Sequence, residues 1–286
     1  MEKQQVKFID VDAILKEKNP SLYRLLPRFI INYIKRKIHQ DFINEGIIEF
    51  KDVYHLAFND CALSYMGASV IWKGEENIPQ TGGVIVCSNH PLGGLDGMAL
   101  IKAVSSRRKD IRFLVNDILK KLENFQSLFV AVNKVGSNTK SALKLIDEIY
   151  AGDEAVLIFP AGLVSRKQAG VIKDLEWKKS FITKSIENKK DVVPVFIDGK
   201  NSDFFYNLAS VRKFLGIKTN IEMLYLPDEM VNQKGKEIEI NFGKPIPHTV
   251  FDNSKTHYEW ARLVKEYVYT IKSDAPGCFT EFLKGC

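Results

Sequence analysis

A histidine and an aspartate flank a glycine-containing turn near residue 90, and these residue types at this spacing suit acid–base chemistry. An apolar run at 84–87 leads through Ser88 and Asn89 into His90, and a Pro-Leu-Gly-Gly-Leu turn then reaches Asp96. A histidine leaving a strand and an aspartate a few residues on can meet across one tight loop. Asp96 would then hold one ring nitrogen of His90, so that the other nitrogen can accept a proton from a substrate hydroxyl.

Two glycines, Gly93 and Gly94, are expected to shape this turn. Glycine allows a positive φ and lets a ligand approach the backbone closely, and the amides at the start of the following helix could bind an anion. The alternative interpretation is purely structural, with Asp96 as a helix cap and His90 satisfied by the backbone of the turn. Spacing alone leaves both interpretations open.

Two further segments strengthen the chemical interpretation, because together with the first they resemble a known family. Asn89-His90 with Asp96 resembles the first signature block of the glycerolipid acyltransferases of the lysophosphatidate acyltransferase type. Residues 159–166, Phe-Pro-Ala-Gly-Leu-Val-Ser-Arg, are similar to the family's third block, Phe-Pro-Glu-Gly-Thr-Arg-Ser, and residues 192–195 to its fourth. The resemblance covers about residues 68–245. It implies transfer of a fatty acyl group from a thioester, on acyl carrier protein or coenzyme A, to a hydroxyl group of a lysolipid.

The departures from the family pattern bear on the acceptor. The family has four residues between the histidine and the aspartate, whereas five separate His90 from Asp96, so the turn must bulge at its glycines. Ala161 and Leu163 replace a glutamate and a threonine that help hold glycerol phosphate in the family. The altered blocks look like a divergent branch, similar to the O-acyltransferases of amino-acid-containing lipids, whose acceptor is an N-(3-hydroxyacyl) amino acid.

The resemblance also implies which residues bind substrate. Lys134 would replace the arginine that ends the family's second block, with a compact ammonium charge in place of a bidentate guanidinium. Arg166 and Lys167 would keep the site basic for an anionic head group. The expected catalytic pair is His90 and Asp96, and the expected substrate-binding residues are Asn89, Gly93, Gly94, Lys134, Pro160, Gly162, Ser165, Arg166 and Lys167. No metal and no cofactor other than the thioester co-substrate is expected.

The elements that must position these residues follow from the apolar pattern. Seven runs are predicted as strands: 68–72, 83–87, 111–115, 128–132, 155–159, 192–197 and 238–242. Helices are predicted at 96–106, 139–150, 177–188, 204–215 and 255–272, the last capped by Ser254. This alternation is typical of an α/β fold in which helices cover a mostly parallel sheet of about seven strands. Ligands of such sheets bind at the carboxyl ends of strands, where His90 is expected.

Residues 1–67 are predicted to be a helical region preceding an acyltransferase domain at 68–286. Ser21 is a candidate N-cap, and apolar residues from Leu22 to Ile38 recur at steps of three and four. Pro27 predicts a kink or two short helices. No acidic residue occurs from Ser21 to Gln40, so the segment suits an anionic bilayer surface. A helix packed on the domain with a solvated basic face is the alternative.

Composition excludes several classes of protein. Of 286 residues, 45% are apolar and 27% are charged, which is ordinary for a globular chain and excludes wholesale disorder. The net charge of +6 is not gathered into a basic stripe with aromatic residues, so nucleic acid is not an expected partner. We expect a cytoplasmic protein that is peripheral on the inner face of the cell membrane. Two alternatives stay open: a non-catalytic lipid- or carrier-binding module on the same scaffold, and a thioester hydrolase.

Overall fold

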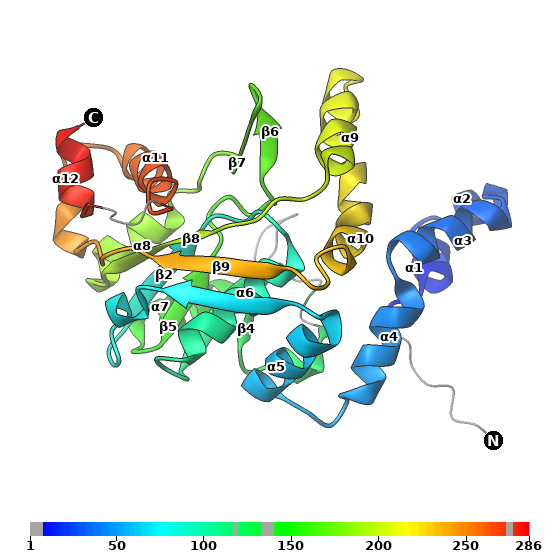
Figure 1. Cartoon of the computed structure of the whole chain (residues 1–286), viewed down its shortest axis with the longest axis horizontal. Coiled ribbons are helices and arrows are strands. Elements are labelled where there is room, and N and C mark those ends of the chain that lie inside the picture. Colours follow the sequence, from blue (N-terminus) through cyan, green and yellow to red (C-terminus); the bar gives the residue numbers. More distant parts are fainter. Residues whose placement is uncertain (1–7, 117–118, 120, 133–139, 273–276, 286) are drawn as a thin grey trace.

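The computed structural model describes residues 8–116, 119, 121–132, 140–272 and 277–285. Within them, seven strands form one sheet in the order β1-β9-β8-β2-β5-β3-β4 (Figure 1). The strands are β1 (Ser69–Lys73), β2 (Val84–Ser88), β3 (Ile111–Asn116), β4 (Phe129–Val132), β5 (Ala155–Ile158), β8 (Val192–Ile197) and β9 (Glu237–Phe242). All neighbours are parallel except β8 and β9, so β1 and β9 run opposite to the other five. The predicted α/β fold with a mostly parallel sheet is confirmed.

Helices cover both faces of the sheet, as its apolar strands require. On one face lie α5 (His55–Met66) and α6 (Gly94–Ser105), and on the other lie α7 (Lys140–Ala151), α8 (Ser180–Asn188), α11 (His257–Val268) and α12 (Phe279–Lys284). The central strand β2 shows the division, since Val84 and Val86 belong to one core and Ile85 and Cys87 to the other. All five residues of β2 are buried. β2 is therefore enclosed by β5 and β8 at its two edges and by a helix-covered core on each face.

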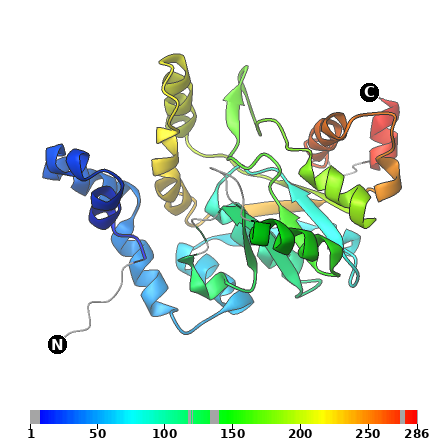
Figure 2. The same ribbon diagram turned by 180° about the vertical axis from the view of Figure 1, so that it is seen from behind.

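The amino-terminal helices project from one end of the molecule, opposite α11 and α12 (Figures 1 and 2). They are α1 (Val11–Lys18), α2 (Pro20–Leu25), α3 (Arg28–Lys37) and α4 (Gln40–Glu49). The chain breaks into two helices at Pro27, as its sequence predicts. Ion pairs from Lys37 and His39 to Asp228, at 2.9 and 2.8 Å, tie this region to α10 (Leu226–Val231). No helix in the described residues is both long and apolar enough to cross a bilayer.

Two predicted helix caps are wrong, and several short elements were not foreseen. Asn19, not Ser21, caps α2, because Pro20 takes the first helical position and the Asn19 side chain accepts the Leu22 N–H. Thr256, not Ser254, caps α11 in a reciprocal pair with Glu259. The sequence also did not predict α10, α12 or the antiparallel ribbon of β6 (Arg166–Gln168) and β7 (Val171–Lys173). Each spans six residues or fewer, too short for a period to emerge.

The core beside β2 should be sensitive to truncation. Leu157 is fully buried in β5, opposite Val86 of β2 and Phe113 of β3. We expect Leu157→Ala to lower the free energy of unfolding by about 2–5 kcal/mol, through lost burial and a residual cavity. Urea denaturation measures the change. The control is Val171→Ala on exposed β7, which should stay within about 0.5 kcal/mol; equal losses would contradict this account of the core.

Candidate active site

The loop that leaves β2 brings His90 and Asp96 into contact. The strand ends at Ser88, and α6 begins at Gly94, with Asp96 in its first turn. Gly93 has a φ of 87°, a conformation that glycine adopts without strain, and it absorbs the extra residue of the turn. The Asp96 Oδ2 atom lies 2.9 Å from His90 Nδ1. The five-residue spacing therefore preserves the contact between imidazole and carboxylate.

The same carboxylate oxygen also holds the backbone of the turn. Asp96 Oδ2 accepts the N–H groups of Leu92 and Gly93 at 2.7 and 3.0 Å. Because these backbone partners can only donate, Oδ2 acts as an acceptor, and His90 Nδ1 must carry the hydrogen directed at it. The other ring nitrogen, Nε2, is then left with a lone pair. Asp96 thus sets both the shape of the turn and the tautomer of His90.

Asp96 is fully buried beneath the turn. Its burial raises the pKa of the carboxyl group, and the hydrogen bonds from His90 and the backbone oppose this rise by stabilising the ionised form. Its second oxygen, Oδ1, has no hydrogen-bond partner within the described part of the chain. Oδ2 is consequently the atom through which the protein stabilises this charge.

The imidazole ring of His90 is held by stacking on one face and remains partly exposed to solvent. The ring of His90 stacks on Phe159 with a centroid distance of 4.1 Å and an interplanar angle of 13°. Phe159 is held in turn by Phe113, at 5.2 Å and 66°. The His90 side chain remains 16% exposed, which leaves the ring accessible to a substrate. A located, partly exposed imidazole with a free nitrogen is suited to general-base chemistry.

A second buried carboxylate, Asp174, joins the His90 loop to the segment that follows β5. Its Oδ1 accepts the His90 N–H at 3.2 Å and the Ser165 hydroxyl at 2.6 Å, and its Oδ2 accepts the Trp177 indole N–H at 2.9 Å. Ser165 also donates its N–H to the His90 carbonyl at 2.8 Å. Burial raises the pKa of Asp174, against the effect of these hydrogen bonds. No motif marked Asp174 in the sequence, because His90, whose backbone it holds, lies 84 residues away along the chain.

The structure places the other predicted site residues in different surroundings. The Asn89 side chain bonds both the N–H and the carbonyl of Ile197, at 2.7 and 2.9 Å, and so fastens the loop to β8. Arg166 is buried and pairs at 2.9 Å with the fully buried Glu222, which also pairs with Arg212, so its guanidinium is engaged inside the protein. Lys167 is exposed on β6.

The remaining predicted residues lie in turns or outside the described residues. Pro160 is buried, and its carbonyl accepts the Lys178 N–H. Gly162 adopts a φ of 65° and donates its N–H to Phe159. Gly94 lies in the first turn of α6, where an added Cβ would stand 3.3 Å from the Met230 sulfur. Lys134 lies outside the described residues.

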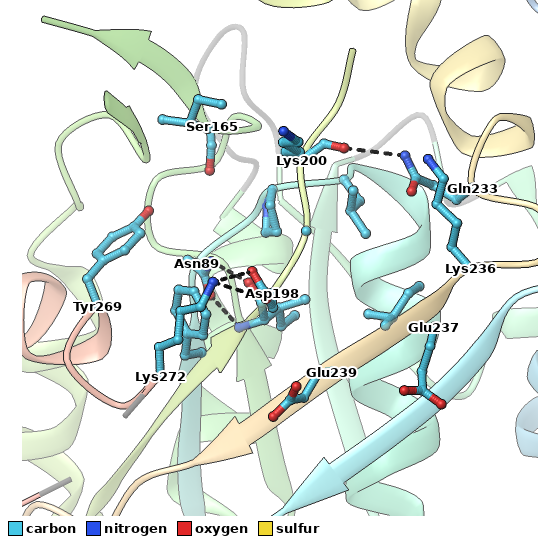
Figure 3. A pocket seen from close by; sticks show the side chains of 17 residues that line it. Asn89, Ser165, Asp198, Lys200, Gln233, Lys236, Glu237, Glu239, Tyr269 and Lys272 are labelled. Carbon is cyan, nitrogen blue, oxygen red and sulfur yellow. Dashed lines mark hydrogen bonds and ion pairs between the residues drawn. The ribbon is translucent and has the colours of Figure 1, made fainter. Parts of the chain in front are cut away.

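A pocket of about 660 Å³ opens beside the loop, over the adjacent ends of β8 and β9 (Figure 3). Asn89, Pro91 and Leu92 line it, whereas His90 does not. Lysines and carboxylates are mixed around its wall, and Lys272 pairs with Asp198 at 3.1 Å. The histidine side of the loop and this pocket are thus two distinct surfaces, and only the first carries the imidazole.

A buried aspartate orients a histidine at the tip of a covered, mostly parallel sheet, and this arrangement suits general-base chemistry in an α/β protein. Residues 13–276 match the family model described as Acyltransferase, and the chain belongs to this family.

Individual relatives agree with this membership. The chain is 49% identical over 265 residues to the lyso-glycine lipid O-acyltransferase of Bacteroides thetaiotaomicron, covering 92% of this chain and 97% of the relative. It is 44% identical over 272 residues to the protein of the same name from Phocaeicola vulgatus, covering 95% and 98%. Among solved structures it is similar to the 1-acyl-sn-glycerophosphate acyltransferase PlsC of Thermotoga maritima. That match has a TM-score of 0.46 and 18% identity, and it covers 93% and 95% of the two chains.

The Asp174 network predicts a positioning role. Asp174→Asn replaces one carboxylate oxygen by an NH₂ group, which is a donor. At least one of the donors that bond Asp174 then loses its acceptor. We expect a stability loss of about 1–3 kcal/mol. We also expect a lower kcat with little change in KM, because the His90 backbone loses its anchor. Denaturant titration and steady-state acyl transfer measure the two effects.

The matched control is Asp153→Asn, at a carboxylate whose side chain is 90% exposed. It should change neither quantity. A fully active Asp174→Asn variant would show that His90 is positioned without this carboxylate.

Proposed function

We propose that the protein is an O-acyltransferase that moves a fatty acyl group from a thioester to the hydroxyl of a lysolipid whose polar end is an amino acid. The acceptor that we favour is a lyso-glycine lipid, an N-(3-hydroxyacyl) glycine, since two relatives of near-complete coverage carry that name. The observation that carries the chemistry is the 2.9 Å contact of His90 Nδ1 with Asp96 Oδ2. The donor would be acyl carrier protein or coenzyme A bearing the acyl group.

The proposed reaction is a direct transfer. His90 Nε2 removes the proton of the acceptor hydroxyl as its oxygen attacks the thioester carbonyl. The tetrahedral intermediate collapses when the C–S bond breaks, and the protonated imidazole returns the proton to the leaving thiolate. A positioned base of this kind contributes about 10²–10⁴-fold to the rate. Asp96 supports the step by stabilising the transient imidazolium, and no acyl-enzyme is required.

The oxyanion needs N–H donors that are not already used. The amides of Leu92 and Gly93 bond Asp96, and the amide of Gly162 bonds Phe159, so these three are occupied. The amide of Gly94 begins α6, where no preceding turn supplies a carbonyl, and Gly94 is exposed. We assign the oxyanion to this first turn, where the helix dipole also favours negative charge.

The anionic end of the acceptor would be held by other cations than Arg166, which is buried and engaged by Glu222. Lys167, exposed on β6, is one proposed contact, and Lys134, expected from the sequence, is the other. Ala161 and Leu163 remove two polar groups that the glycerolipid branch places here, which favours an acceptor other than lysophosphatidate. The glycine carboxylate carries one charge and fits this reduced set of polar groups.

We further propose that the enzyme is peripheral at the inner face of the cell membrane, held there by α2 and α3. Leu22, Leu25 and Phe29 of these helices are exposed. Arg24 and Arg36 are exposed beside them, and neither has an ion-pair partner among the described residues. Three other cations of the predicted basic face are paired, Arg28 and Lys35 with Asp12 and Lys37 with Asp228. The membrane contact would therefore rely on the apolar residues together with Arg24 and Arg36.

Removing the imidazole should abolish most of the activity. We expect His90→Ala to lower the acyl-transfer rate by about 10²–10⁴-fold while the protein stays folded. The control is His248→Ala, since His248 forms a second His–Asp pair with Asp191, at 3.1 Å and remote from the loop. Product analysis by mass spectrometry, with and without the lysolipid, also separates transfer from hydrolysis. Undiminished turnover of His90→Ala would remove His90 from the mechanism, whereas absent turnover by the unaltered protein would favour a binding module.

Neutralising the unpaired cations of α2 and α3 should weaken membrane attachment. We expect Arg24→Gln with Arg36→Gln to reduce binding to anionic vesicles by about ten-fold or more, because each basic residue near such a surface contributes about 1 kcal/mol. Co-sedimentation measures the binding. The same charge change at Lys144 and Arg262, on α7 and α11, is the control and should have no effect. Equal binding of both variants would remove these helices from the membrane contact.

A further inference from the structure

The carboxyl-terminal end of α9 (Asp203–Phe214) carries large apolar side chains into solvent, far from the sheet (Figures 1 and 2). Phe214 is 89% exposed and Leu215 is 62% exposed, and Val211 and Ile217 are exposed beside them. We name these four residues the α9 tip. The base of the same helix is buried, since Phe205 and Tyr206 form a small core with Val164. The helix thus has a fixed base and an uncovered apolar end.

The charge around the α9 tip has one sign. No acidic residue occurs from Phe204 to Ile221, whereas Lys213 and Lys218 flank the apolar residues and are exposed. Arg212 is turned inward and pairs with buried Glu222 at 2.7 Å. Apolar side chains framed by lysines match the interface of an anionic bilayer, where rings and acyl chains meet phosphate groups.

The short 3₁₀ helix η4 (Ile221–Tyr225) connects α9 with the amino-terminal helices. Tyr225 bonds Tyr33 of α3 at 3.1 Å and packs edge-on against Phe204 at the base of α9 at 5.0 Å. Leu224 of η4 is itself exposed between them. Both regions lie on the side of the molecule away from α11 and α12, where the amino-terminal helices extend outward and α9 rises above the sheet (Figure 2). One planar lipid surface could therefore contact both.

The base of α9 is bonded directly to the loop of His90. Asn201, just before the helix, donates from its side chain to the Pro91 carbonyl at 3.1 Å. Glu222 links Arg212 of α9 to Arg166, which follows Ser165. The orientation of α9 at a surface would thus set the orientation of the site.

We propose that the α9 tip inserts into the interface of an anionic bilayer and, with α2, sets the enzyme's orientation so that the His90 side of the loop faces the lipid acceptor. The inference deepens the proposed function and rests on it, because an acceptor with acyl chains resides in the bilayer. Phe214 and Leu215 enter the acyl boundary, and Lys213 and Lys218 contact the head groups. Neither the tip nor the lysines take part in the acyl-transfer step.

The test replaces the two most exposed residues by Phe214→Ser with Leu215→Ser. Vesicles of phosphatidylglycerol and phosphatidylcholine, and vesicles of phosphatidylcholine alone, are the probes. We expect co-sedimentation with the anionic vesicles to fall by about ten-fold or more, because the apolar area that enters the bilayer is lost. Lys213→Gln with Lys218→Gln should lower binding to the anionic vesicles only.

The matched control is Leu143→Ser with Leu145→Ser, at two exposed leucines of α7. It should leave vesicle binding unchanged, and thermal unfolding should show that all variants are folded. Turnover of acceptor in detergent micelles should equal that of the unaltered enzyme in the tip variant, whereas turnover of acceptor embedded in vesicles should fall.

Several outcomes would overturn the proposal. Unchanged vesicle binding of the tip variant would do so. So would a loss confined to binding of acyl carrier protein, or to self-association in sedimentation velocity, because each would assign the tip to a protein partner. Failure of the proposed function is a separate result: it would appear as absent acyl transfer by the unaltered enzyme in micelles, whatever the vesicle binding.

Discussion

The contact between the buried Asp96 carboxylate and the His90 ring is the interaction on which this molecule depends. An imidazole at a surface rotates freely and exchanges tautomers, and neither state is reliably a base. A carboxylate with no access to water removes that freedom, because Nδ1 must donate to it. The burial that raises the pKa of Asp96 is opposed in part by the hydrogen bond from His90 and by the backbone N–H groups of the same turn. Asp96 Oδ2 thus fixes the backbone of the turn and the tautomer of His90, and it accepts the hydrogen bonds that stabilise the carboxylate.

The rest of the loop is arranged so that this contact does not move. Asn89 bonds β8 on one side, and Ser165 and Asp174 hold the His90 backbone on the other. Parallel strands make such convergence possible, since the loops after β2, β5 and β8 leave the sheet at one edge. Several residues that resemble binding groups in the sequence are therefore engaged in support. Under the proposed function, the substrate would meet groups left unused among the described residues, namely Nε2 of His90, the Gly94 amide and the exposed Lys167.

The exposed apolar and basic side chains around this site lie on one side of the molecule. The amino-terminal helices, η4 and the α9 tip expose apolar and basic side chains at one end, and α9 is bonded at its base to the catalytic loop. A lipid acceptor differs from a dissolved substrate because it reaches the enzyme from one plane. If the enzyme attaches to the membrane through α9, which is bonded to the loop of His90, binding would also orient His90 toward the lipid acceptor. Membrane binding would then favour acyl transfer without any conformational change.

The sequence by itself determined the seven strands, because continuous apolar runs specify buried strands. It placed His90 and Asp96 on one short turn, where they can meet, and the tertiary structure decided that they do. The sequence did not reveal Asp174 as an anchor of His90, Glu222 as the partner of Arg166, or Asn89 as a clamp on Ile197, because the two members of each pair are far apart along the chain. Whether a charged or amide side chain faces substrate or protein depends on what packs against it. Long-range packing is set by the whole tertiary structure, and that alone decided which residues of the motif remain free for chemistry.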